Sequence, residues 1–135
     1  MPLLVDTGVI YALADRRDAW HKRVRAYLVA NPDTLLAPAT ILPEVAYLLR
    51  TRIGADAERA FVGSVARGEI AVEPISRIDC GRADQLIAAY DWLGFVDATV
   101  VAVAERLKIS SVATTDRRHF GVVRPAHVER LTLLP

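Results

Sequence analysis

The stretch LLVDTGVIYALA, residues 3–14, changes character at a single charged residue. Leu3–Val5 is long enough for a short strand in a sheet that is buried on both faces. The mostly apolar segment Thr7–Ala14 predicts a helix. A strand that runs directly into a helix is the first half of a βαβ unit, and Asp6 stands at the junction. Because a carboxylate in such apolar surroundings is costly unless something compensates it, Asp6 requires a partner.

The rest of the chain repeats this alternation of short apolar runs and longer helical segments. We expect further strands over residues 35–37, 70–75, 110–114 and 131–134. We expect helices over residues 18–31, 40–53, 56–67, 78–93 and 97–107. Strands separated by helices predict a mostly parallel sheet covered on both faces. The fold class is therefore α/β, a three-layer α/β/α sandwich in one domain over residues 1–135.

Several details of these helices are also predicted from the pattern. The expected N-cap residues are Asp18, Thr40 and Asp56. The helix over residues 78–93 is expected to point Ile78, Leu86, Tyr90 and Leu93 inward. Between Asp116 and the last strand we expect irregular chain.

Composition excludes several classes of protein. Of the 135 residues, 53% are hydrophobic and the mean hydropathy is +0.25, which excludes a disordered chain. The net charge of +1 creates no general field that would attract nucleic acid, so any basic surface must be local. The single cysteine, Cys80, excludes an internal disulfide and fits a reducing compartment. No apolar run reaches the length of a membrane span, and we expect a cytoplasmic protein.

Four acidic residues stand in apolar surroundings at the ends of strands or the starts of helices. Asp6 follows the first strand and Asp116 follows the strand SVATT, while Glu44 and Asp97 lie early in helices. The carboxyl ends of parallel strands meet at the same edge of a sheet, so these side chains are expected to converge. Clustered carboxylates repel one another unless a cation lies between them, and oxygen ligands suit Mg²⁺ or Mn²⁺.

Each acid also has an ordinary structural interpretation. Asp97 could be a helix N-cap, and Glu44 could interact favourably with the positive end of its helix. Asp6 and Asp116 could be loop residues that end a strand. The convergence of all four favours the metal site. The sequence contains no His/Cys set with zinc-like spacing, no Walker-type glycine-rich loop and no Gly-x-Ser-x-Gly elbow.

Four segments resemble, in order and spacing, the motifs of PIN-domain ribonucleases, and most nearly the VapC toxins of bacterial toxin–antitoxin pairs. They are LLVDTGVIYAL (residues 3–13), PEVAYLL (43–49), FVDATVVAVAERL (95–107) and VATTDRRHF (112–120). The resemblance implies an acidic Mg²⁺-binding pocket whose catalytic and metal-binding residues are Asp6, Glu44, Asp97 and Asp116. It also implies that the hydroxyls of Thr7 and Thr114 help to arrange the site. One departure is Gly8, which stands where these toxins often carry serine.

The resemblance further implies an RNA substrate, a VapB-like antitoxin, a homodimer and a toxin that inhibits translation. The expected chemistry is hydrolysis of a phosphodiester by water, which leaves 5′-phosphate and 3′-hydroxyl ends. Because an acidic pocket repels RNA, basic residues must line its rim. The candidates are Arg16, Arg17, Arg117 and Arg118, with further basic residues from Lys22 to Arg25. Trp20, Trp92 and Phe95 could stack on bases, but their spacing favours the core or an interface.

Two other functions remain open at this point. One is a different Mg²⁺-dependent phosphohydrolase or a phospho-accepting receiver domain. A receiver needs a lysine near its acids, whereas Lys22 and Lys108 do not follow strands, and a dehalogenase-like phosphatase would carry an acid at the position of Gly8. The other is a PIN-like module that binds RNA or a partner without cutting. Acids hold RNA poorly without a metal, which argues against this module.

Overall fold

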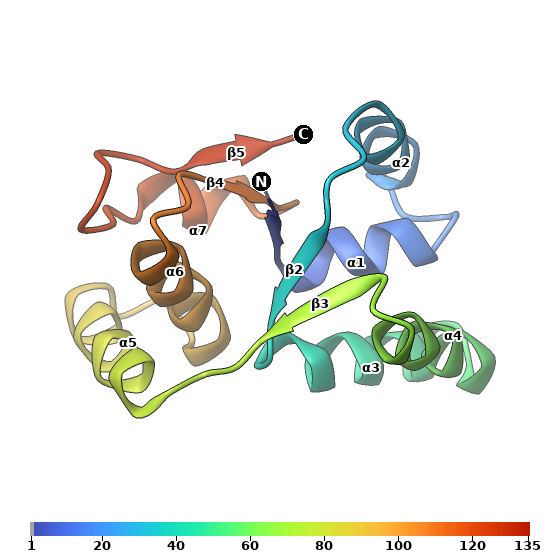
Figure 1. Ribbon diagram of the computed structural model, residues 1–135, viewed down its shortest axis with the longest axis horizontal. Coiled ribbons are helices and arrows are strands. Elements are labelled where there is room, and N and C mark those ends of the chain that lie inside the picture. The colour runs from blue at the N-terminus through green and yellow to red at the C-terminus, as the bar shows by residue number, and fades with distance from the viewer. Residues whose placement is uncertain (1) are drawn as a thin grey trace.

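Five short strands form one sheet in the order β3-β2-β1-β4-β5, and every pair of neighbours is parallel (Figure 1). The computed structural model describes residues 2–135. The strands are β1 (Leu3–Val5), β2 (Leu35–Pro38), β3 (Ile70–Glu73), β4 (Ser111–Ala113) and β5 (Thr132–Leu134). The helices are α1 (Thr7–Ala14), α2 (His21–Ala30), α3 (Ile41–Arg52), α4 (Ala55–Ala66), α5 (Arg77–Ala89), α6 (Phe95–Leu107) and α7 (Arg117–Val122).

The central strand is β1, which has two strands on each side of it in the sheet. β2 and β3 follow on one side, whereas β4 and β5 lie on the other, so the strand order reverses between β1 and β4. Leu4 is in register with Leu36 of β2 and with Val112 of β4. Such a reversal opens a crevice at the carboxyl ends of the strands, where open parallel sheets bind their ligands.

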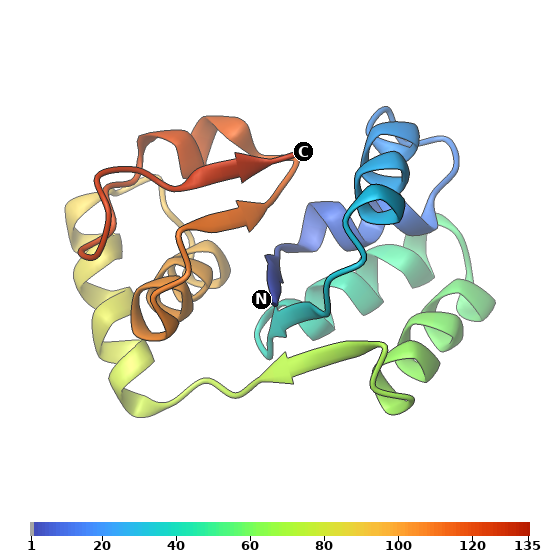
Figure 2. The same cartoon turned by 45° about the horizontal axis from the view of Figure 1, so that its top comes forward.

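Helices cover the sheet on both sides. α3 packs with α1 and α4, and α5 packs with α6, and the two groups lie on opposite sides of the sheet in Figures 1 and 2. The prediction of a three-layer α/β/α sandwich is therefore confirmed, and the sheet is entirely parallel.

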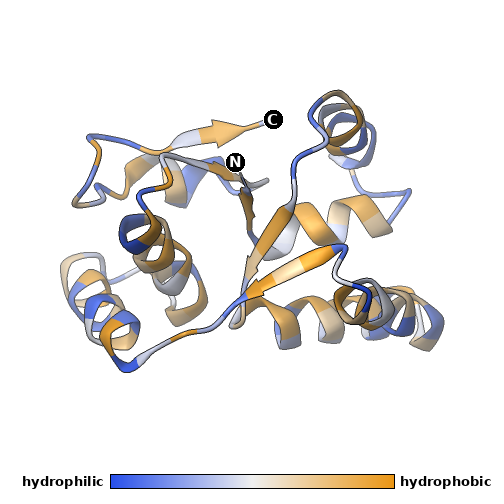
Figure 3. Cartoon of the chain, viewed as in Figure 1, coloured by the Kyte–Doolittle hydropathy of each residue, from blue (hydrophilic) through white to orange (hydrophobic). Residues whose placement is uncertain are grey.

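The core is one cluster that joins β1, β2 and β4 with buried side chains of α1, α3 and α6. All residues of α6 from Ala98 to Glu105 are buried, which explains why this helix is apolar around most of its circumference. The strands are mostly hydrophobic along their length, as Figure 3 shows, because helices cover both faces of the sheet. No helix among residues 2–135 has both the length and the apolar character needed to cross a bilayer.

Two elements end two or more residues earlier than the sequence pattern predicted. β3 ends at Glu73 because Pro74 follows it, and α5 ends at Ala89, so Leu93 lies outside the helix although it is buried. The inward orientation predicted for Ile78 was wrong. Its side chain is 81% exposed, because the neighbouring Asp79 takes the buried position in the first turn of α5.

The predicted N-caps were only partly correct. Thr40 precedes α3 as expected, but α2 begins at His21, because Asp18 accepts a hydrogen bond from the Trp20 backbone N–H in a preceding turn. Gly54 stands at the N-cap of α4, and Asp56 lies inside its first turn.

The segment after Asp116 is helical, and the prediction of irregular chain there was wrong. The carboxylate of Asp116 accepts a hydrogen bond from the His119 backbone N–H (2.9 Å) and caps α7. Phe120 is fully buried and anchors this short helix to the core. Local propensity in RRHFGV is weak, so burial of Phe120 and the cap together stabilise the helix.

Candidate active site

Asp6 lies at the end of β1, where the strand order of the sheet reverses. Its backbone N–H donates to the carbonyl of Ala113 on β4 (3.2 Å), which extends the strand pairing up to the first residue of the crevice. One carboxylate oxygen caps α1 by accepting from the Val9 N–H (3.3 Å), and the other accepts from the hydroxyl of Thr114. Only 5% of Asp6 is exposed. Both contacts are neutral, so no positive charge compensates this carboxylate.

Thr114 connects two of the predicted acids. Its hydroxyl donates to Asp6 and accepts from the backbone N–H of Asp116 (2.8 Å), and the residue is fully buried. Asp116 begins α7 just beyond β4. The arrangement holds the ends of β1 and β4 at a fixed spacing, which is what a rigid site requires.

Asp97 and Glu44 are brought to the same edge by the starts of α6 and α3. The hydroxyls of Thr99 on α6 and Thr40 before α3 lie 2.6 Å apart, and Thr99 also donates to the carbonyl of Val96. Asp97 is half-buried in the first turn of α6, whereas Glu44 is exposed in the first turn of α3. Gly94 stands at the N-cap of α6, so the ordinary interpretation of Asp97 as an N-cap is wrong.

The acids remain close to one another without arginine or lysine partners. Burial raises the pKa of Asp6 from 3.8 to about 7; the Thr114 hydroxyl and the Val9 N–H oppose this shift, and the charges of Asp97 and Asp116 add to it. Burial and the charges of Asp116 and Glu44 raise the pKa of Asp97 to about 6. Within residues 2–135, no arginine or lysine forms an ion pair with any of the four. The site therefore has unbalanced negative charge.

His119 joins this cluster, a contact that the scattered positions of the three histidines did not predict. Its Nδ1 lies 3.0 Å from Oδ2 of Asp116 and 3.9 Å from Oδ2 of Asp97. One ligand atom from each of these three residues lies within 4.8 Å of the other two. The signal in the sequence is the spacing of three residues between Asp116 and His119, which places both at the first turn of one helix.

The donors present fit a hard divalent cation. Carboxylate oxygens dominate the set, and the cluster carries more negative charge than His119 can balance. The hydroxyl of Thr7, next to Asp6, is buried without a hydrogen-bond partner among the described residues. An unpaired buried hydroxyl costs free energy, so a polar group beside it is expected.

Gly8 is explained by its neighbour across the crevice. A Cβ atom at position 8 would overlap Oγ1 of Thr115 and lie 3.6 Å from Oδ1 of Asp6. Glycine at this position lets the Thr115 side chain approach α1 closely. The Thr115 hydroxyl, from the loop after β4, therefore occupies the space that a serine side chain at position 8 would need.

The predicted basic residues divide into two groups. Arg117 and Arg118 are exposed directly after Asp116, and the Arg117 guanidinium lies 5.5 Å from the centre of the Trp20 ring. Arg16 and Arg17 follow the far end of α1, around a surface hollow that Arg52 and Ile53 also line. Since the eight residues of α1 span about 12 Å, the structure does not bring Arg16 and Arg17 beside the acids.

Comparison with known proteins gives one consistent result. Residues 3–124 match the model of the PIN domain family. The chain is 29% identical over 135 residues to Ribonuclease VapC26 of Mycobacterium tuberculosis, covering 98% of this chain and 100% of that protein.

Solved structures resemble the fold over most of its length. The sarcin-ricin loop cleaving toxin VapC20 of M. tuberculosis has a TM-score of 0.83 at 24% identity and covers 93% of this chain and 98% of its own. A toxin–antitoxin complex from Klebsiella pneumoniae has a TM-score of 0.71 at 19% identity and covers 90% of this chain and 92% of its own.

Proposed function

Because the chain belongs to the PIN domain family, we propose that it is a metal-dependent ribonuclease and the toxin of a toxin–antitoxin pair. The observation that carries this proposal is the group of acids without arginine or lysine partners at the carboxyl ends of β1 and β4. The similarity to Ribonuclease VapC26 over nearly the whole chain supports the same activity.

The proposed metal site uses the acids predicted from the sequence together with His119. Ligand atoms of Asp97, Asp116 and His119 lie within 4.8 Å of one another, while Asp6 is buried and Glu44 is exposed. Mg²⁺ is the expected ion, with Mn²⁺ as a substitute. When bound, such an ion lowers the pKa of a water molecule and neutralises charge on the phosphoryl oxygens.

The protein's own residues orient this chemistry. Thr114 holds Asp6 and the backbone of Asp116 in one arrangement, so the carboxylates do not need to reorganise during the reaction. Arg117 and Arg118 at the rim bind RNA phosphates and offset the repulsion from the acids. Attack by water, rather than by the ribose 2′-hydroxyl, leaves a 5′-phosphate and a 3′-hydroxyl.

The family relationship extends the proposal to partners. A small VapB-like antitoxin is the expected partner, and the toxin acts as a homodimer in the cytoplasm. VapC20 is described as cleaving the sarcin-ricin loop, so an RNA containing that loop is the first substrate to test.

The decisive experiment is RNA cleavage by the purified protein. With Mg²⁺ or Mn²⁺ it should cut RNA to products with 5′-phosphate ends, and excess EDTA should stop the reaction. Asp6→Asn should be inactive, whereas Asp84→Asn, which changes an exposed acid on α5, should retain full activity. Equal cleavage by wild type and Asp6→Asn would show that the activity comes from elsewhere.

Metal binding can be measured separately from cleavage. Because the acids converge only in the folded chain, millimolar Mg²⁺ should raise the midpoint of thermal unfolding. Asp6→Asn should reduce that shift, and the absence of any shift in the wild type would contradict a metal site.

A further inference from the structure

We propose that Trp92 is a stacking platform for an unpaired nucleobase of the RNA next to the scissile phosphate. This inference rests on the ribonuclease function proposed above. Trp92 lies in the short connection between α5 and α6, five residues before Asp97. No residue of this connection belongs to the predicted catalytic set, and its role is an additional one in substrate binding.

The indole lies one side chain away from the acids. Its ring stacks on the imidazole of His119 at a centroid distance of 4.9 Å and an angle of 26°. His119 Nδ1 in turn lies 3.0 Å from Oδ2 of Asp116. A base on the open surface of Trp92 would therefore belong to a nucleotide at or beside the cleaved bond.

Trp92 is both exposed and held in place. It is 40% exposed, and Phe95 at the start of α6 is 50% exposed. Tyr90 packs against Trp92 at 5.5 Å, and the Tyr90 hydroxyl accepts from the Arg124 N–H (3.1 Å). Leu93 is 3% exposed and anchors the connection in the core. A ring that is already ordered loses little entropy on binding.

Charge explains why an aromatic contact suits this position. Asp97 and Asp116 repel phosphates, so RNA binding beside them benefits from a contact that does not depend on charge. Stacking of a base on an aromatic ring provides such a contact, worth about 1–3 kcal/mol per base. The Arg117 guanidinium lies against Trp20 rather than Trp92.

The two tryptophans also differ in their surroundings. Arg23 and Arg117 lie 4.7 Å and 5.5 Å from the centre of the Trp20 ring, so that ring is occupied by cation–π contacts. Trp92 lies outside the helices, so helical spacing says nothing about its role, and its exposure excludes a place in the core. Since a base inside a duplex is stacked on both faces, the substrate presents an unstacked nucleotide of a loop or single strand here.

The test combines a protein variant with an RNA that lacks one base. Oligonucleotides that contain the mapped cleavage site are made with an abasic nucleotide at each flanking position in turn. For the wild type, one of these substitutions should raise KM about 10-fold or more. In Trp92→Leu, KM for the intact RNA should rise by a similar factor, and the abasic substitution should then change KM less than about twofold. The kcat should change little in both cases.

The controls distinguish loss of stacking from loss of structure. Trp92→Phe keeps a smaller ring and should have an intermediate KM and a thermal midpoint close to that of the wild type. Ile78→Ala removes an exposed apolar side chain at the opposite end of α5 and should leave KM unchanged. Additive effects of the abasic site and Trp92→Leu would overturn the inference while leaving the ribonuclease function intact.

A binding measurement decides the inference even if no RNA is cleaved. Trp20→Phe leaves Trp92 as the only tryptophan, so its fluorescence reports on stacking. In an Asp6→Asn background with Mg²⁺ present, where no cleavage is expected, single-stranded oligonucleotides should quench this emission, and an abasic oligonucleotide of equal length should not. Equal quenching by both, or none by either, would overturn the stacking platform. Failure of the proposed function is recognised separately, as absence of metal-dependent cleavage by the wild type.

Discussion

Asp6 and Asp79 are buried to nearly the same extent, at 5% and 2% exposure, yet their pKa values move in opposite directions. Burial raises the pKa of Asp6 to about 7, because only a hydroxyl and one backbone N–H contact it. Burial also acts to raise the pKa of Asp79, but Arg106 and the Ser76 N–H outweigh it, and the pKa lies below its ordinary value. The deeper position of Asp6 in the protein interior and the charged partner of Asp79 together account for the opposite directions of the two pKa shifts.

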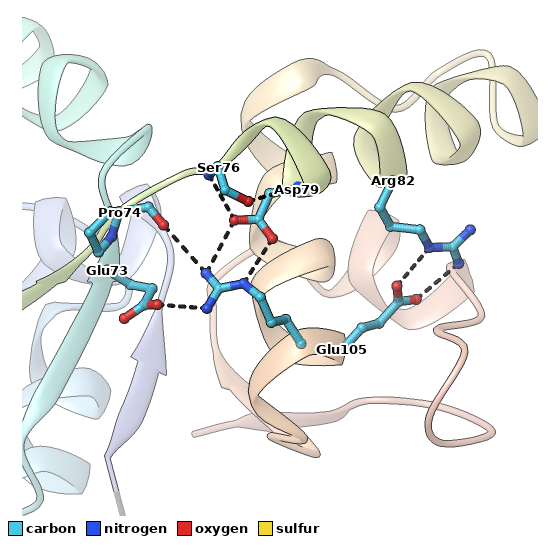
Figure 4. A network of polar contacts seen from close by, with 7 residues as sticks. Glu73, Pro74, Ser76, Asp79, Arg82 and Glu105 are labelled. Carbon is cyan, nitrogen blue, oxygen red and sulfur yellow. Dashed lines mark hydrogen bonds and ion pairs between the residues drawn. The ribbon is translucent and has the colours of Figure 1, made fainter.

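The two regions differ in how the chain balances its own charges. On the α5–α6 side, Arg106 binds Asp79 with two nitrogens (2.9 and 3.1 Å) and reaches Glu73 (2.8 Å), and Arg82 binds Glu105 (Figure 4). At the carboxyl edge of the sheet, no arginine or lysine of the described chain pairs with the acids. The acids of the first region are balanced by arginines of the same chain, whereas the acids of the second region keep negative charge that a ligand can balance.

The largest expected effect compares two acids on the same helix. Asp97→Asn should lower kcat for RNA cleavage by about 100-fold or more, because it removes a proposed metal ligand. Glu105→Gln, which changes the partner of Arg82, should leave kcat within about twofold. Steady-state cleavage rates and the Mg²⁺-induced thermal shift measure both variants. Similar losses of kcat in the two would remove the distinction between the regions.

Removing an ion pair from the α5–α6 side should lower the stability of the protein and leave its activity unchanged. Arg106→Leu leaves Asp79 buried without its charged partner and should lower the free energy of unfolding by about 2–3 kcal/mol. The loss should be smaller than for a fully buried pair, since the Arg106 side chain is 34% exposed. Denaturant unfolding measures the effect. Arg67→Leu, which breaks the exposed pair with Glu69, is the matched control and should cost less than about 1 kcal/mol.

The pH dependence of stability should have opposite signs for the two aspartates. The folded-state pKa of Asp6 exceeds its ordinary value, so its ionisation disfavours folding increasingly from about pH 4 to pH 7. In EDTA, Asp6→Asn should therefore stabilise the protein at pH 8, by about 1–2 kcal/mol, and much less at pH 4. The pKa of Asp79 is lowered, so Asp79→Asn should destabilise the protein at pH 8 and progressively less as the pH falls. Denaturant unfolding at pH 4 and pH 8 measures the change in the free energy of unfolding for each variant. A change of the same sign for both variants at pH 8 would contradict the comparison.

The smallest expected effect concerns the packing beside Asp6. Gly8→Ala should lower the free energy of unfolding by about 1 kcal/mol, because the added methyl group displaces the Thr115 hydroxyl. Combining it with Thr115→Ala should recover most of that loss, which a double-mutant cycle measures. If the two effects are additive, the side chains do not compete for the same space.

The architecture and the first strand-to-helix junction were predictable because their signals are local. Leu3–Val5 and Thr7–Ala14 have the bounds predicted from their apolar runs, and the place of Asp6 between them follows directly. Alternation of strands and helices was enough to predict a parallel sheet, since parallel strands need helical crossovers. The sequence likewise predicted that Asp6 and Asp116 follow strands whose carboxyl ends share one edge of the sheet.

Contacts between distant parts of the chain were not predictable in this way. The bond from Thr114 to Asp6, the position of His119 beside Asp97, and the stack of Trp92 on His119 each join different elements. The same holds for Asp79, whose sequence neighbours give no sign that Arg106 will neutralise it. Periodicity and capping act within a few residues, so the sequence pattern could place each acid on an element. Whether an acid is paired or available to a cation depends on which cation the folded chain brings beside it.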